Sequence, residues 1–138
     1  MPSSFSLVLC VSLALSSFAN GAILNPAAKL VGGHSSISDV SAPEIVAAGV
    51  AVARHFDSTS SSRLNVASFA RVTSGTKQVV SGMKYEIEVE LSPTACARDA
   101  ADESCTSVGP PFCVVKANVW SQPWLKKNTV SLLSEACK

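Results

Sequence analysis

The chain has little charge, and the charges that it has are not clustered. Asp, Glu, Lys and Arg make up 15% of the 138 residues, the formal net charge is +1, and the longest basic run is the pair Lys126-Lys127. A protein that binds nucleic acid needs a basic patch to neutralise phosphates. We therefore expect no nucleic-acid partner.

Side chains for catalysis and metal binding are also scarce. The chain has only two histidines, of which His34 lies in a stretch without periodicity and His55 follows Arg54, where a solvated surface position is expected. The glutamates between residues 84 and 90 alternate along one face of a predicted strand, where no cleft surrounds them for acid–base work. We therefore predict no enzymatic activity, no catalytic residues and no cofactor.

Only the N-terminus carries a long apolar run, and it is typical of an export signal. Residues 7–15 are largely apolar but too few to span a bilayer, and the small residues Ser17, Ala19 and Gly21 follow. We expect residues 1–21 to be a signal peptide cleaved after Ala19 or Gly21, leaving 22–138 as a single domain. The alternative is a buried N-terminal helix. No later stretch could cross a membrane, so we predict a secreted, extracellular protein with no membrane partner.

Removal of the leader would also remove Cys10 and leave an even number of cysteines: Cys96, Cys105, Cys113 and Cys137. An even number in a small secreted chain predicts disulfides, and three pairings are formally possible. Closing Cys96 on Cys105 is the simplest choice for the first two. The spacings lack the short paired hooks of a zinc site, so we expect no metal.

Hydrophobic periodicity predicts one helix over residues 42–56. Ser41-Ala42-Pro43-Glu44 matches a capping box with proline in the first turn, and apolar residues follow at spacings of three and four. Gly49 lies within this apolar stripe, which favours close contact between the helix and a sheet. The stripe consists of Ile45, Val46, Gly49, Val52, Ala53 and Phe56.

The rest of the chain predicts an antiparallel sheet that is covered on one side. Residues 83–91 alternate strictly between apolar and charged side chains, as a strand with one buried face does. Gly75 is expected to mark a bulge or a bend. The predicted segments are an extended, mobile arm (22–38), strands at 64–73, 83–91, 112–120 and 129–136, and a long connection at 92–111.

Two of the predicted turns carry apolar side chains that a turn does not need. Gln78-Val79-Val80-Ser81-Gly82 places two valines where Asn, Asp or Gly is usual, and Trp124 follows Pro123 at the second turn. Either the valines are buried as strand ends, or they contact a partner. The arm adds a third apolar segment, Leu30-Val31-Gly32-Gly33, although a flexible leader of this kind is common.

Together these segments resemble the type 2 cystatins, secreted inhibitors of papain-like cysteine (thiol) proteases. That family has a Leu-Val-Gly-Gly-type arm, a Gln-Val-Val-Ala-Gly first hairpin, a Pro-Trp second hairpin and four cysteines paired in sequence order. The segments 30–33, 78–82 and 123–124 match in order, with Ser81 in place of alanine. A single added hydroxyl should matter little if it stays hydrated.

The resemblance implies an α+β, cystatin-like fold: one long helix wrapped by a twisted antiparallel sheet of four to five strands. It also implies the disulfides Cys96–Cys105 and Cys113–Cys137. By analogy the arm and both hairpins would form a wedge that blocks the protease cleft. The implied protease-binding residues are Leu30, Val31, Gly32, Gln78, Val79, Val80, Ser81, Gly82, Pro123 and Trp124.

The resemblance further implies a monomer that acts reversibly and competitively on proteases of the cathepsin L, cathepsin S or cathepsin B type. A non-inhibitory secreted binding module of the same fold is the alternative. Some family members also inhibit legumain through Ser-Asn-Asp after the helix. Here that loop is Ser60-Ser61-Ser62-Arg63, with no asparagine before Asn65, so we expect no legumain inhibition through that site.

Overall fold

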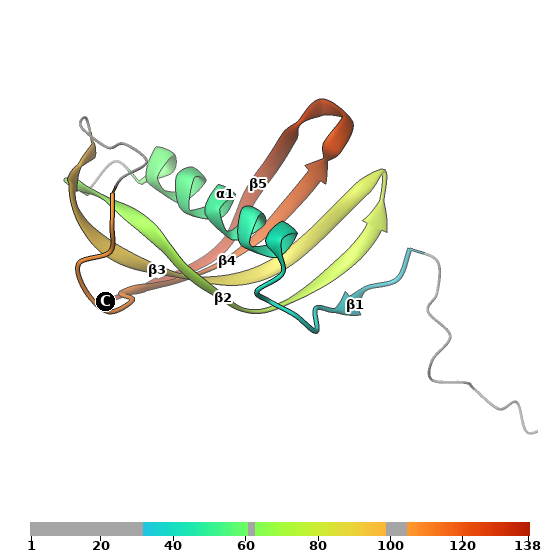
Figure 1. Cartoon of the computed structure of the whole chain (residues 1–138), viewed down its shortest axis with the longest axis horizontal. Helices are drawn as coiled ribbons and strands as arrows, with labels where there is room; N and C mark the ends of the chain where they lie inside the picture. The colour runs from blue at the N-terminus through green and yellow to red at the C-terminus, as the bar shows by residue number, and fades with distance from the viewer. Residues whose placement is uncertain (1–31, 61–62, 99–104) are drawn as a thin grey trace, which may run out of the picture.

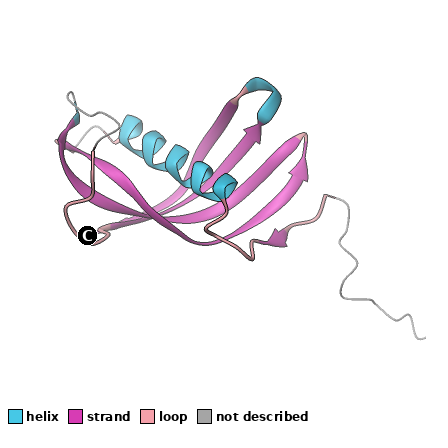
Figure 2. Ribbon diagram, viewed as in Figure 1, coloured by secondary structure: helices cyan, strands magenta, loops and turns pink. Residues whose placement is uncertain are grey.

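The computed structural model describes residues 32–60, 63–98 and 105–138. Within them one helix lies across one face of a five-stranded antiparallel sheet with the strand order β1-β2-β3-β4-β5 (Figures 1 and 2). This is the fold class that the sequence predicts. The elements are β1 (Ser35–Ser36), α1 (Pro43–Thr59), β2 (Asn65–Val80), β3 (Gly82–Ala97), β4 (Cys113–Gln122) and β5 (Lys127–Cys137).

Helix α1 begins where the sequence predicts, but the capping box does not form. The N-cap residue is Ala42, and its side chain makes no cap hydrogen bond. The Ser41 hydroxyl instead donates to Oδ1 of Asp39 at 2.6 Å, and the Ser41 backbone N–H donates to the same oxygen at 2.9 Å. Asp39 thus fixes the turn before the helix, and Pro43 supplies a backbone angle suited to the first turn.

The helix ends at Thr59, beyond the predicted end at residue 56. The hydroxyls of Ser58 and Thr59 donate to the backbone oxygen of His55, at 2.7 and 3.0 Å. These side chains therefore satisfy a carbonyl of the last turn. The serine-rich stretch predicted as loop from Ser58 onward begins as helix for this reason.

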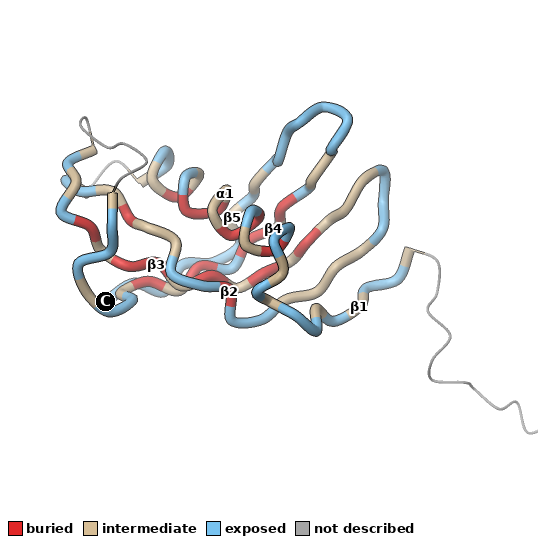
Figure 3. Tube along the Cα trace, viewed as in Figure 1, coloured by how far each residue is buried: buried red, intermediate tan, exposed pale blue. Residues whose placement is uncertain are grey.

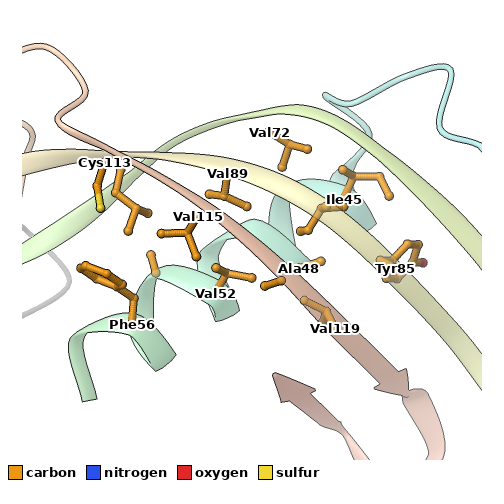
Figure 4. Close-up of a cluster of buried hydrophobic side chains, with 14 of the residues drawn as sticks. Ile45, Ala48, Val52, Phe56, Val72, Tyr85, Val89, Cys113, Val115 and Val119 are labelled. Carbon is orange, nitrogen blue, oxygen red and sulfur yellow. The ribbon is translucent and has the colours of Figure 1, made fainter. Parts of the chain in front are cut away.

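The core lies between α1 and the concave face of the sheet, where Ile45, Val52 and Phe56 of the helix point towards Val89, Val115 and Val119 (Figure 4). Gly49 is buried in this interface, and a Cβ atom there would overlap the ring of Phe69 on β2. The close helix–sheet contact predicted from Gly49 is confirmed. The largest fully buried aliphatic and aromatic residues are Phe56, Ile45, Ile87, Leu91, Val52, Val89, Val115 and Val119.

Strands β2 and β3 are longer than predicted. The polar residues 74–77 continue β2, and residues 92–97, predicted as connection, continue β3. Pairing explains the first extension, because residues 74–77 are paired with residues 85–88 of β3, and Thr76 and Lys77 are also paired with β1. Of the three register shifts between β2 and β3, the one nearest to Gly75 lies between Val72 and Ser74, so Gly75 is not itself the bulge.

Two disulfides, Cys96–Cys105 and Cys113–Cys137, connect the cysteines as expected. Cys113 and Cys137 lie directly opposite each other in the register of β4 and β5. This bond therefore joins the two strands at the end of the sheet remote from their connecting turn.

The described part of the arm is paired with the sheet. Ser35 and Ser36 form β1 opposite Lys77 and Thr76 of β2. The Ile37 N–H also donates to the Gly75 oxygen at 2.9 Å. The expectation of a mobile arm over 22–38 is therefore wrong for its last part. The predicted signal peptide and residues 22–31 lie outside the described residues.

Candidate functional site

Three chain segments that are distant in sequence follow one another along one edge of the molecule. They are the beginning of the described arm at Gly32, the β2–β3 turn and the β4–β5 turn, all on the right-hand side of Figure 1. Both turns are largely exposed in Figure 3. We call this edge the loop edge, and define it by Gly32, residues 78–82 and residues 123–125.

The tip of the β2–β3 hairpin presents two valines to solvent. Val79 is 65% exposed and Val80 is 38% exposed, while Ser81 alone connects the paired residues Val80 and Gly82. Of the two alternatives left open by the sequence, burial as strand ends is therefore excluded. The strands below the tip are held by a continuous ladder, so the valines are presented on a firmly paired hairpin.

Position 82 requires glycine for two reasons, the backbone conformation there and the closeness of neighbouring atoms. Its φ of 94° lies in the left-handed region that side chains disfavour. A Cβ atom at this position would also meet the Ser121 backbone oxygen and approach the Trp124 ring within 3.3 Å. The first hairpin can therefore lie directly against the second only because residue 82 has no side chain.

The second tip exposes two apolar side chains. Residues Pro123–Leu125 form a single 3₁₀ turn, and Lys126 closes it with a φ of 48°. Trp124 is 59% exposed and Leu125 is 58% exposed. The sequence singled out Pro123 and Trp124, but not Leu125. The sequence did contain an indication of its role, because Leu125 is an apolar residue directly after the tryptophan of a turn.

The arm is linked to the first tip by a side chain. Gln78 Nε2 donates to the backbone oxygen of Gly32 at 2.5 Å. Gly32 has a φ of 81°, and no atom would lie within 4 Å of an added Cβ. The structure thus brings together Gly32, Gln78–Gly82 and Pro123–Trp124, whereas Leu30 and Val31 lie outside the described residues.

The sequence reasoning missed one further residue near both tips. Trp120 lies on β4 and donates its indole Nε1–H to the backbone oxygen of Ser81 at 2.8 Å. Val119 and Val115 on the same strand are buried against the helix, so the period of two places Trp120 on the outer face. That alternation was visible in the sequence, although the contact with Ser81 was not.

The large exposed side chains of the loop edge are apolar, and the carboxyl groups of Glu86 and Asp57, whose pKa values are shifted, lie elsewhere. Glu86 is on the outer sheet face, where the hydrogen bond and charge of Lys116 lower the pKa of its carboxyl. Asp57 lies near the end of α1, where desolvation raises the pKa of its carboxyl against the hydrogen bond from the Ala67 N–H. Binding at the loop edge would therefore depend mainly on buried apolar area.

A groove lies between the exposed side of α1 and β5. One serine, Ser58, and one histidine, His55, are among the residues that line it. The Ser58 hydroxyl donates to the His55 backbone oxygen at 2.7 Å, so it is engaged by a carbonyl rather than by the imidazole. Among the described residues, no group of three or more His, Cys, Asp or Glu could hold a metal ion. The groove is lined by Ala47, Val50, Ala51, Arg54, His55, Ser58, Asn128 and Val130.

None of the helices in the described ranges has the length and apolar character needed to cross a membrane.

Comparison with known families identifies the fold. The sequence model of the family described as "Cystatin domain" matches residues 32–130, which is most of the chain. The chain belongs to the cystatin family. The matched range includes Gly32 and both hairpin tips of the loop edge.

Cystatins from distant organisms share part of this sequence. The cystatin of Coturnix japonica is 37% identical over 73 residues, which cover 49% of this chain and 61% of that protein. Cysteine proteinase inhibitor 8 of Oryza sativa subsp. japonica is 52% identical over 69 residues, covering 49% of this chain and 53% of that protein. The similarity therefore spans a little over half the length of these relatives.

Solved structures share the fold. Dimeric human cystatin F superimposes with a TM-score of 0.70 at 22% identity, covering 80% of this chain and 90% of the other. The structure called Al-CPI gives a TM-score of 0.63 at 23% identity, covering 78% of this chain and all of the other. At such identities the likeness concerns the fold alone.

Proposed function

We propose that this protein is a reversible, competitive inhibitor of papain-like cysteine proteases, and that the loop edge enters the active-site cleft. The observation that carries the proposal is the exposure of Val79 and Val80, at 65% and 38%, on a paired hairpin tip. Membership of the cystatin family and the names of relatives such as the rice cysteine proteinase inhibitor support the target class.

In the proposed complex the first tip contacts the middle of the cleft, and Val79 and Val80 approach the rim of the active site. Trp124 and Leu125 pack on one side of this contact, towards the primed subsites. Their exposed apolar surface would be removed from water when the protease binds, at roughly 25 cal/mol per Å². A hairpin already held by its ladder loses little conformational entropy in doing so.

The arm is proposed to lie on the other side of the first tip. Leu30 and Val31 would enter the non-primed substrate pockets. Gly32, which has open space around its Cα atom, would let the chain pass the protease nucleophile. The Gln78–Gly32 hydrogen bond would hold the start of this segment beside the first tip. The cleft is thereby blocked without presenting a peptide bond for cleavage.

The proposal also covers where the protein acts, its oligomeric state and its target proteases. We propose that the protein is exported after removal of residues 1–21 and acts as an extracellular monomer. Its targets would be proteases of the cathepsin L, S or B type. We expect no legumain inhibition through the loop after α1, because the amide of Asn65 is engaged with the Thr94 oxygen at 3.1 Å. Legumain inhibition that is lost on mutation of Asn65 would contradict that expectation.

The test is a titration of purified residues 22–138 against active-site-titrated papain and a cathepsin L-type enzyme. We expect reversible inhibition at one inhibitor per enzyme that is overcome by rising substrate concentration. A correctly folded protein that does not inhibit at micromolar concentration would overturn the proposal. That result would favour the binding module without inhibitory activity.

A further inference from the structure

The two hairpin tips of the loop edge are joined by a contact that lies outside both turn motifs. We propose that Trp120 is a positioning residue that holds the first tip in a fixed orientation relative to the second. This inference rests on the proposed function, because the orientation matters only if both tips bind one partner. Trp120 itself need not touch that partner.

A hydrogen bond connects the side chain of Trp120 to the first tip. The indole Nε1–H of Trp120 donates to the Ser81 oxygen at 2.8 Å, across 39 positions of sequence. Ser81 is the single residue that connects the two strands at the first tip. A carbonyl at such a tip has no ladder partner, so the indole supplies the restraint that the sheet cannot.

A different contact restrains the next residue. The Cα of Gly82 lies against the backbone of Ser121, which follows Trp120 in β4. The side chain of Trp120 and the backbone of its neighbour therefore fix consecutive residues of the first tip. Two contacts on adjacent peptide units restrict rotation as well as translation of the tip, which one contact alone would not do.

Trp120 has little role in the core. It is 38% exposed and lies opposite Lys84 on the sheet face away from α1. Burial against the helix is provided by Val115, Ala117 and Val119 of the same strand, which are all fully buried. The indole is thus positioned to orient the tip, and changing it should leave the helix–sheet packing intact.

The consequence concerns the lifetime of the complex. A tip that is already oriented pays less ordering cost when it binds, and such gains appear mainly in the dissociation rate. We expect Trp120→Phe, which keeps a ring but loses the donor, to dissociate from papain about three- to tenfold faster. That range corresponds to the net contribution of one hydrogen bond. The association rate should change less than about twofold.

The experiment compares Trp120→Phe with Asn118→Ala, a change two residues earlier on the same face of β4 and remote from Ser81. Both variants should keep the far-ultraviolet circular dichroism of the wild type. Only Trp120→Phe should show the faster dissociation from papain. Equal dissociation rates for Trp120→Phe and wild type, with the fold intact, would overturn the inference.

A second measurement tests the contact in the free protein and needs no protease. The chain has two tryptophans, Trp120 and Trp124, so Trp124→Phe leaves a single indole N–H resonance and assigns both in the wild type. The Trp120 indole hydrogen should exchange with water at least about fivefold more slowly than that of Trp124. Equal exchange would refute the contact even if Trp120→Phe fails to fold. If the wild type does not inhibit papain, the proposed function fails, and slow exchange would still support the contact.

Discussion

Two glycines of the loop edge have positive φ but different surroundings, and this difference gives a prediction. Gly82→Ala places a Cβ against the Ser121 oxygen, whereas Gly32→Ala meets no atom within 4 Å. We expect Gly82→Ala to lower the free energy of unfolding by about 1 to 3 kcal/mol more than Gly32→Ala does, because overlap with the Ser121 oxygen is added to the strain of the positive φ that both glycines share. Gly32→Ala has only the strain of its φ of 81° and should lower the free energy of unfolding by about 1 to 2 kcal/mol.

Urea unfolding followed by circular dichroism measures both variants. The prediction for Gly82 fails if the two alanine variants are equally stable, since the φ angles alone do not distinguish them.

Asp57 offers a test with a pH dependence. Its Oδ1 accepts a hydrogen bond from the Ala67 N–H at 2.9 Å, so Asp57→Ala leaves that donor unpaired and should cost about 1 to 3 kcal/mol. Asp57→Asn retains an oxygen acceptor and should cost less. Desolvation raises the folded-state pKa of Asp57 above its ordinary value of 3.8, so the folded protein binds the proton more tightly than the unfolded chain does.

The stability of the wild type relative to Asp57→Asn should therefore increase as the pH falls from 7 through the raised folded-state pKa. It should stop increasing below the unfolded-state value near 3.8. Unfolding curves at several pH values provide the measurement. A stability difference that does not vary with pH would contradict the assigned direction of the pKa shift.

The exposed side chains of the loop edge were only partly predictable. Val79, Val80 and Trp124 are apolar residues in predicted turns, and that conflict between residue type and position identified them. Trp120 could be placed on the outer face from alternation, but its hydrogen-bond partner is the backbone oxygen of Ser81, which belongs to another hairpin. Contacts with backbone atoms across hairpins depend on register and twist, which residue types do not specify.

Helix α1 is held close to the sheet at Gly49. This contact predicts whether Gly49→Ala raises or lowers the stability of the protein. Alanine is favoured over glycine in a helix by about 1 kcal/mol, yet Gly49→Ala would place its Cβ in the ring of Phe69. Overpacking typically costs about 1 to 3 kcal/mol, so we expect a net loss of stability. The double variant Gly49→Ala with Phe69→Leu should recover part of the loss.

The matched control is Ala47→Gly on the exposed side of the same helix, which should lose about 1 kcal/mol from propensity alone. Chemical denaturation measures the free energy of unfolding of these three variants and of the wild type. A Gly49→Ala variant more stable than the wild type would mean that the helix can move away from β2 without cost.

The existence and order of the main elements were predictable, but their ends were not. Strict alternation in residues 83–91 and the three-and-four spacing after Pro43 identified β3 and α1. The capping box failed because Ser41 bonds to Asp39, a competition between two local partners that the sequence motif ignores. The short strand β1 forms through pairing with the polar part of β2, and that part of β2 is itself paired with β3, so neither segment needs a hydrophobic pattern of its own.

The assembled molecule places three segments beside each other, so each should contribute to one complex. Removal of residues 22–31, Gly32→Trp and Trp124→Ala should each increase the dissociation rate from papain. For Trp124→Ala we expect about thirtyfold, as for an aromatic side chain that an interface removes from water. Stopped-flow displacement measures the rates.

Leu133→Ala is the control for this series, because Leu133 is 49% exposed on β5 and lies outside the loop edge. Its dissociation rate should equal that of the wild type. Unchanged rates for all three loop-edge variants would contradict a shared contact surface.

Occupation of the protease cleft is the central claim, and binding to papain with an open or a filled cleft tests it most directly. Calorimetric titration of residues 22–138 into free papain should give one binding site. With papain whose cleft is filled by a covalently attached peptidyl inhibitor, the loop edge could not enter, and we predict that binding is lost. Equal affinity for open and filled papain would contradict the account, because the protein would then bind outside the cleft.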